Sequence, residues 1–158
     1  MLPPEPWPRP SLLLVFVEKS RALSISFYRK LTEEEKELGV CLINIGAGTT
    51  SVVVFHNGAI HYTMVLPIAG DQVTNDLAIA LRLPTQLAEK IKIEHACAQI
   101  NGSDPHYDIQ VPALGNSPEQ TLTQSTLAEV IEPRYEELFE IIKHSLKEKH
   151  LERVARAG

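Results

Sequence analysis

A glycine-rich run between two apolar segments carries the strongest chemical signal in this sequence. The run reads Asn44-Ile45-Gly46-Ala47-Gly48-Thr49-Thr50. It follows the apolar segment Val40–Ile43 and precedes a second one, Ser51–Phe55, which predicts a tight turn between two strands. Glycine permits positive φ angles and lets backbone N–H groups approach a phosphate closely, and threonine hydroxyls add further donors. The run therefore indicates a phosphate-binding loop, with an ordinary β-turn as the alternative on these residues alone.

Few other side chains are arranged for chemistry. His56 and His61 flank a predicted hairpin and have no Cys or carboxylate partner at a metal-ligand spacing, so they are predicted to be surface strand residues. Asp71 and Asp76 fit helix capping and surface positions better than the role of catalytic acids. We therefore predict no metal site and no catalytic residue, because no side chain is a convincing general base.

Composition narrows the class of protein. The chain has 158 residues, of which 44% are apolar, enough for a hydrophobic core. Its net charge is −5 and its pI is about 5.7, and it has no basic stripe, so a nucleic-acid partner is not expected. Cys41 and Cys97 lie far apart, which is typical of a reducing compartment. The apolar run Leu12–Val17 is too short to span a bilayer, and no signal peptide is recognisable, so we expect a soluble cytoplasmic protein.

The first part of the chain is expected to be irregular and then to become helical. Residues 1–10 contain five prolines and predict an extended tail. Ser11–Lys30 predicts one strand and one short helix. Leu31–Leu38 predicts a helix with Thr32 as its N-cap, because three glutamates follow in the first turn, where carboxylates are favoured.

A β-meander is expected next. Val40–Ile45 is almost entirely apolar, which predicts a central strand covered on both faces. Thr50–Phe55 should pair with it, and Asn57-Gly58 should form a type I′ turn that leads into a third strand, Ala59–Leu66. From Gly70 the apolar period becomes helical, with one predicted face formed by Val73, Leu77, Ala80 and Leu81.

The remaining elements follow from breakers and spacing. Pro84 should end the first helix and Thr85 should open another, which carries Leu87, Ala88, Ile91 and His95. Tyr107–Val111 predicts a strand and Pro112–Pro118 a loop. A long helix is expected over residues 126–149, with a Thr126/Glu129 capping box and a kink at Pro133. Its core face should comprise Leu127, Val130, Ile131, Tyr135, Leu138, Ile142 and Leu146.

The order of meander, glycine-rich turn and Gly-Asp-initiated helices resembles the second lobe of the actin/Hsp70/sugar-kinase superfamily. The segments GVCLINIGAGTTSVVVF and TLAEVIEPRYEELFEIIK are similar to the bacterial cell-division protein family FtsA, and the resemblance runs from about residue 31 to about residue 146. It implies an α/β fold, a partial actin-like (ribonuclease H-like) lobe with a β-meander and helices, plus a small α+β subdomain. The implied division is 31–98 for subdomain 2A and 99–150 for subdomain 2B, between an atypical, partly disordered segment (1–30) and a tail (151–158).

The resemblance also implies a nucleotide. Gly46, Gly48, Thr49 and Thr50 match the loop that reaches the β- and γ-phosphates of ATP. Asn44 occupies a position that is usually Asp in the family, where a carboxylate helps to hold Mg²⁺ or the attacking water. Because Asn lacks the charge, this departure weakens the case for metal binding and hydrolysis more than the case for nucleotide binding.

Three further positions match nucleotide contacts of the superfamily. Gly70 matches a glycine near the ribose and phosphates, and Glu89 and Lys92 match a Glu-x-x-Lys helix face that contacts adenine and ribose. Solvated helix charges are an equal alternative for this pair. ATP lies between two lobes in the superfamily, so one lobe alone lacks about half of the donors, and binding by this chain unaided is not expected.

Arg134 and Glu137 match positions where the family docks the carboxy-terminal tail of the ring protein FtsZ. A guanidinium fork can hold a carboxylate of an acidic tail with two hydrogen bonds, although a merely solvated arginine is the alternative.

The resemblance implies a division adaptor that links the FtsZ ring to the cytoplasmic membrane at the septum, with at most weak ATPase activity. The first lobe, the self-association subdomain and a membrane helix have no match here, so a truncated and impaired fragment is expected, and residues 1–30 are a candidate annotation artefact. One alternative is a fragment of an Hsp70-like or sugar-kinase-like phosphotransferase, which would need a carboxylate at position 44 or elsewhere beside the γ-phosphate. The other is an inert relic.

Overall fold

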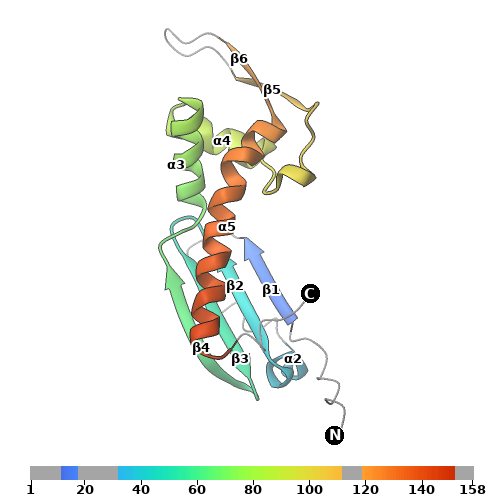
Figure 1. Cartoon of the computed structure of the whole chain (residues 1–158), viewed down its shortest axis with the longest axis vertical. Helices are drawn as coiled ribbons and strands as arrows, with labels where there is room; N and C mark the ends of the chain where they lie inside the picture. Colours follow the sequence, from blue (N-terminus) through green and yellow to red (C-terminus); the bar gives the residue numbers. More distant parts are fainter. Residues whose placement is uncertain (1–11, 18–31, 112–118, 152–158) are drawn as a thin grey trace, which may run out of the picture. The chain divides into compact units, whose positions relative to one another are not determined.

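The computed structural model describes residues 12–17, 32–111 and 119–151. It divides the chain into two compact units (Figure 1): unit 1 comprises Met1–Ala69 with Ile142–Gly158, and unit 2 comprises Gly70–Ile141. The predicted extended tail, the short helix expected after the first strand and the loop expected at 112–118 lie outside the described residues. The predicted subdomain boundary near residue 98 stays a prediction.

Unit 1 contains a four-stranded sheet with the strands in the order β1-β2-β3-β4. The strands are β1 (Leu12–Val17), β2 (Val40–Ile45), β3 (Thr50–His56) and β4 (Ala59–Leu66). The last three are antiparallel neighbours, which confirms the predicted meander. The strand predicted within Ser11–Lys30 is β1, and it adds a fourth strand to the sheet by pairing with β2 in parallel, from Leu12 beside Val40 to Val17 beside Ile45. Parallel neighbours are not joined by a short turn, so sequence leaves no local signal for them.

Strand β2 is the buried centre of the sheet, as predicted. Five of its six residues are buried, and Val40 and Cys41 have no exposed surface. β2 lies between β1 and β3, so hydrogen bonds leave along both of its sides. Strand β4, at the other edge of the sheet, has no fully buried residue, and Ile60 and Val65 are more than half exposed.

The β3–β4 turn also ends a helix. Asn57 and Gly58 both have positive φ angles, 51° and 72°, which confirms the predicted type I′ turn. Helix α2 (Glu33–Leu38) packs beside this turn. The Asn57 N–H donates to the Glu37 carbonyl (3.2 Å) and the Gly58 N–H donates to the Lys36 carbonyl (3.1 Å). The turn therefore satisfies carbonyls that the end of a helix leaves without partners.

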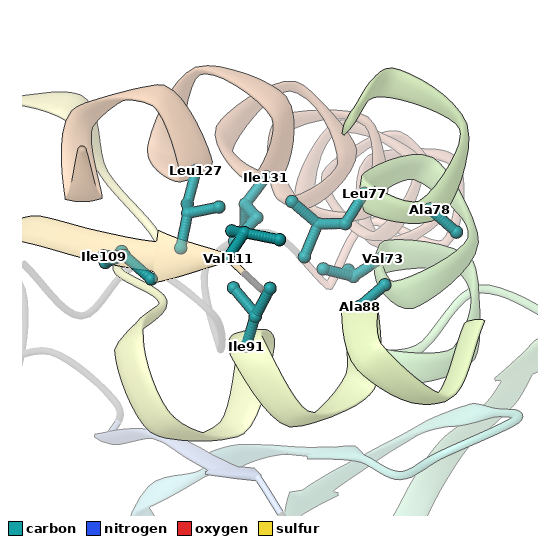
Figure 2. Packing of buried hydrophobic residues seen from close by; sticks show 9 residues of the cluster. All are labelled: Val73, Leu77, Ala78, Ala88, Ile91, Ile109, Val111, Leu127 and Ile131. Carbon is teal, nitrogen blue, oxygen red and sulfur yellow. The ribbon is translucent and has the colours of Figure 1, made fainter. Parts of the chain in front are cut away.

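The described part of unit 2 contains three α-helices, a short 3₁₀ helix and a two-stranded sheet. Its elements are α3 (Gly70–Leu81), α4 (Thr85–His95), η1 (Ile100–Gly102), β5 (Asp108–Val111), β6 (Gln120–Thr123) and α5 (Gln124–Glu148), whose residues from Ile142 onward belong to unit 1. β5 and β6 pair antiparallel. Figure 2 shows the core of the unit, to which α3, α4, β5 and α5 all contribute: Val73, Leu77, Ala78, Ala88, Ile91, Ile109, Val111, Leu127 and Ile131.

The buried face of α3 differs in part from the predicted one. The helix buries Val73, Thr74, Leu77 and Ala78. Ala80, which was predicted to lie in the core, is exposed, and Leu81 is only partly buried. Thr74 takes a core position because its hydroxyl is hydrogen-bonded, which removes most of the cost of burying a polar group.

Helix α5 begins two residues before its predicted start. The Thr123 Oγ1 accepts a hydrogen bond from the Thr126 N–H (3.2 Å), so Thr123 is the N-cap and the predicted Thr126/Glu129 capping box is wrong. Two threonines three residues apart offer alternative caps, and the end of β6 selects the earlier one. Pro133 lies inside the continuous helix, and a kink there stays a prediction. None of the helices in the described ranges has the length and apolar character needed to cross a membrane.

Candidate functional site

The glycine-rich turn joins β2 to β3 and is closed by one internal hydrogen bond. The Gly46 N–H donates to the Thr49 carbonyl (2.9 Å), and a Cβ at Gly46 would lie 3.1 Å from the same oxygen. A side chain at this position would therefore crowd the turn, which favours glycine. The positive φ angle that glycine permits is not used at Gly46 or Gly48. Ala47, Gly48 and Thr49 are exposed, so this part of the loop is the part that a phosphate can approach.

Thr50 faces inward and differs in this respect from the other loop residues. Its side chain is fully buried, and its hydroxyl donates to the Ile68 carbonyl (2.6 Å). A threonine hydroxyl has one hydrogen, so it has none left for a phosphate. The Thr50 hydroxyl, which was expected to contact a phosphate, therefore binds the Ile68 carbonyl instead. The Gly46 N–H is also already hydrogen-bonded within the turn.

Asn44 places a buried oxygen beside the loop. Its Oδ1 is enclosed and has no hydrogen-bond partner within the part of the chain that the structure describes. An unsatisfied buried acceptor of this kind costs about 1–3 kcal/mol. One neutral oxygen does not supply the carboxylates that Mg²⁺ prefers, and the described residues contain no group of three or more His, Cys, Asp or Glu placed to hold a metal. The residues present therefore do not fit a Mg²⁺ site.

Unit 2 brings Gly70, Glu89 and Lys92 together around Thr74. The Lys92 Nζ donates to the Gly70 carbonyl (3.0 Å) and to the Thr74 Oγ1 (2.7 Å), and it pairs with the Glu89 Oε2 (2.6 Å). The Thr74 hydroxyl lies 3.0 Å from the Gly70 carbonyl and also hydrogen-bonds Glu89. We call these four residues the lysine cluster.

The spacing of its residues along α3 and α4 brings the lysine cluster together. Gly70 and Thr74 are four residues apart on α3, and Glu89 and Lys92 are three apart on α4, so each pair shares one face of its helix. The Lys92 side chain is only 18% exposed. The Glu89 side chain is 41% exposed, so the alternative of a solvated charge fits Glu89 better than Lys92. Thr74 was missed by sequence reasoning, although its i+4 spacing from Gly70 was a usable signal.

A second charged group joins α3 to α5. Arg134 donates from Nε to the Asp76 Oδ2 (2.7 Å) and from Nη2 to the Asp76 Oδ1 (3.0 Å), which is a two-bond fork. Its Nη1 donates to the Glu137 Oε2 (2.5 Å). The hydrogen bonds that Arg134 donates to the Asp76 carboxylate are the main cause that raises the pKa of Arg134. We call Asp76, Arg134 and Glu137 the arginine cluster.

The arginine cluster unites two predicted residues with one that was missed. Arg134 and Glu137 lie one helical turn apart, as expected. Asp76 was predicted to be a surface or capping group, and no local pattern could have identified it, because 58 residues separate it from Arg134. The side chains of Arg134 and Asp76 remain 30% and 25% exposed. The cluster is therefore a carboxylate-binding arginine within reach of solvent.

Comparison with known proteins gives a consistent family. The family model described as "Cell division protein FtsA" matches residues 41–157. The chain is 53% identical over 133 residues to cell division protein FtsA of Pseudomonas aeruginosa, a match that covers 84% of this chain and 32% of that protein. It is 46% identical over 123 residues to FtsA of Escherichia coli K12, covering 77% and 29%, respectively. The chain thus spans about a third of the length of these relatives.

Solved structures share the fold at low sequence identity. A structure of MreB 5 of Spiroplasma citri bound to AMPPNP aligns with a TM-score of 0.56 at 12% identity, covering 94% of this chain and 52% of that chain. A PilM–PilN type IV pilus biogenesis complex aligns with a TM-score of 0.52 at 19% identity, covering 75% and 27%. These similarities show the fold alone, an α/β partial actin-like lobe, as predicted. The match to the family model over residues 41–157 establishes that this chain belongs to the FtsA family of cell-division proteins.

Proposed function

We propose that this chain acts as part of an FtsA-type division adaptor and docks the acidic carboxy-terminal tail of FtsZ through Arg134. The observation that carries the proposal is the arginine fork, because Arg134 already holds a carboxylate with two N–H groups while 30% of its side chain is exposed. Such a planar fork matches carboxylates better than a lysine ammonium does. Glu137 is placed beside it and shares the site.

The docking proposal is tested by fluorescence anisotropy with a labelled FtsZ tail peptide and the full 158-residue chain. We expect saturable binding that Arg134→Glu abolishes. Arg82→Glu, an equal charge change at an exposed residue of unit 2, is the matched control and should bind almost normally. Absence of saturable binding, or an equal loss in both variants, would refute docking at Arg134.

We also propose that the exposed Ala47–Thr49 segment contacts the phosphates of ATP. The exposure of these three residues at the tip of a glycine-rich turn supports this role. In ¹H–¹⁵N spectra, ATP should shift the amide resonances of Gly48 and Thr49, whereas adenosine should not. We expect weak binding, because one lobe supplies only part of the donors. Equal shifts with ATP and adenosine would contradict a phosphate contact.

Nucleotide in this proposal is a conformational ligand and not a substrate. Asn44 offers no carboxylate, and membership of the FtsA family favours the adaptor over the Hsp70-like or sugar-kinase-like phosphotransferase. Phosphate release by a chimera that adds a first lobe, measured with Asn44 and with Asn44→Asp, tests this point. Rapid turnover by the parent chimera would favour an enzyme. In the complete adaptor we place this function at the division septum, on the inner face of the cytoplasmic membrane.

A further inference from the structure

We propose that Glu137 is an exchangeable ligand of Arg134, which a carboxylate of an acidic peptide replaces, whereas Asp76 remains bound and positions the guanidinium. Glu137 would then act as a gate on the docking site and not as a contact to the partner. This inference rests on the proposed docking of the FtsZ tail and adds an order of events to it.

The two carboxylates hold Arg134 unequally. Asp76 accepts two hydrogen bonds, from Nε and Nη2, whereas Glu137 accepts one, from Nη1. A two-bond fork fixes both the position and the plane of the guanidinium, and a single bond fixes neither. Loss of Glu137 thus leaves Arg134 oriented, and loss of Asp76 does not.

Exposure favours the same partner for exchange. The Glu137 side chain is 50% exposed and that of Asp76 is 25% exposed. A carboxylate that is half in water regains most of its hydration when its bond breaks, and an ion pair between residues three apart on one helix is worth only a few tenths of a kcal/mol. The bond to Glu137 is therefore the weaker of the two attachments.

The charge of the cluster explains why an exchange is needed at all. One positive charge on Arg134 and two negative charges on Asp76 and Glu137 sum to −1. An acidic peptide that approaches the intact cluster meets net repulsion. When Glu137 turns into solvent, Nη1 becomes free and the incoming carboxylate takes its hydrogen bond.

The variant Glu137→Gln tests the exchange, with Glu136→Gln as its matched control. Both remove one negative charge from α5, but Glu136 is exposed and is not a partner of Arg134. In anisotropy titrations of the full chain with the labelled FtsZ tail peptide, Glu137→Gln should bind about two- to fivefold more tightly than Glu136→Gln. A tail peptide with its acidic residues changed to amides should show no such difference.

Asp76→Asn tests the positioning role. Simple electrostatics predicts tighter binding when a negative charge is removed, whereas positioning predicts weaker binding, which is the result we expect. Asp76→Glu should restore part of the affinity. The Arg134 Nε–H resonance should lose its protection from exchange in Asp76→Asn and keep it in Glu137→Gln. Tighter binding by Asp76→Asn would overturn the positioning role.

Failure of the exchange and failure of the docking are distinguishable. If the peptide binds and Arg134→Glu abolishes binding, but Glu137→Gln equals Glu136→Gln, the exchange is overturned and the docking stands. If the peptide does not bind the parent chain, the docking is overturned. The exchange of Glu137 is then tested without peptide, by urea denaturation of double-mutant cycles that measure the coupling energies of Glu137 and Asp76 to Arg134. A coupling of Glu137 to Arg134 as large as that of Asp76 to Arg134 would overturn it, and a clearly smaller one would support it.

Discussion

Lys92 on α4 and Arg134 on α5 each bind an oxygen of α3 and a glutamate three residues away on their own helix. In the lysine cluster the α3 partners are uncharged, the Gly70 carbonyl and the Thr74 hydroxyl, so Lys92 and Glu89 balance to zero. In the arginine cluster the α3 partner is the carboxylate of Asp76, and the balance is −1. The two clusters thus use one arrangement with different charge.

The difference suits each cluster to a different task. Thr74 is 4% exposed and the Lys92 side chain 18% exposed, so the cation and the hydroxyl are largely shielded from water, although Glu89 is 41% exposed. This neutral cluster stabilises the packing of α3 against α4. The arginine cluster is more exposed, and its two carboxylates outnumber its single positive charge. Surface ion pairs contribute little to stability, so the excess charge costs little here and leaves a partner that can be exchanged.

Removal of the Lys92 ammonium, which is largely shielded from water, should have the largest effect on the free energy of unfolding. Lys92→Met leaves the Thr74 hydroxyl and the Gly70 carbonyl without the donor of Lys92, and we expect a loss of about 2 kcal/mol in the free energy of unfolding. Urea denaturation at pH 7 measures it. Lys90→Met, on the exposed side of α4, is the control and should change stability by less than about 0.5 kcal/mol. Equal losses would show that Lys92 is an ordinary surface lysine.

The hydroxyl that bridges the two helices should rank next. Thr74→Val keeps the shape of the side chain but removes the group that accepts from Lys92 and hydrogen-bonds Glu89. We expect a loss of about 1.5 kcal/mol in unfolding free energy, because Lys92 and Glu89 each lose a hydrogen-bond partner. Thr74→Ser retains the hydroxyl and should lose clearly less. A larger loss in the serine variant would mean that packing of the methyl group matters more than hydrogen bonding.

The arginine cluster should contribute less and depend on salt. Arg134→Met is expected to cost about 1 kcal/mol in low salt, and less in molar salt, since screening shortens the range of exposed charges. The cost of Lys92→Met should change less with salt, because its cluster is more buried. Arg134→Lys should recover under half of the loss, since an ammonium cannot form the fork to Asp76. Salt dependence of equal size in both clusters would remove the contrast between them.

Cys41 lies outside both clusters, and its ionisation should have the smallest effect on the free energy of unfolding at neutral pH. Burial raises the pKa of the Cys41 thiol from 9.0 to about 11. Because the folded pKa is the higher one, the contribution of Cys41 is fully present below pH 9 and is lost as the pH rises toward 11, by about 1 kcal/mol at pH 10. The unfolding free energy of Cys41→Ala should fall less steeply between pH 8 and pH 10 than that of Cys97→Ala. If the unfolding free energies of the two variants fell in parallel with pH, the raised pKa of Cys41 would be contradicted.

Local patterns in the sequence predicted most elements of this fold. Asn57-Gly58 predicted its turn because few residue pairs tolerate two positive φ angles, and Pro84 followed by Thr85 predicted the break between α3 and α4. The start of α5 was misplaced because Thr123 and Thr126 are both acceptable caps. The parallel pairing of β1 was missed because its register depends on residues far along the chain.

The resemblance to the family named Glu89, Lys92, Arg134 and Glu137, and the spacing of three residues in each pair agrees with one face of a helix. Asp76 was missed because its partner Arg134 lies on another helix, and Thr74 was missed although it lies four residues from Gly70 on the same helix. Residue type alone suggested a phosphate contact for the Thr50 hydroxyl, but this side chain turns inward and donates to the Ile68 carbonyl.

The burial of Cys41 has a practical consequence. Its thiol is protonated at neutral pH and has no exposed surface, whereas Cys97 is only partly buried and donates a single weak bond to the Gln99 carbonyl (3.3 Å). A maleimide dye added to the native chain will therefore modify Cys97 and spare Cys41. The unaltered sequence already carries one selective attachment point in unit 2, from which a fluorophore can report motions of that unit alone.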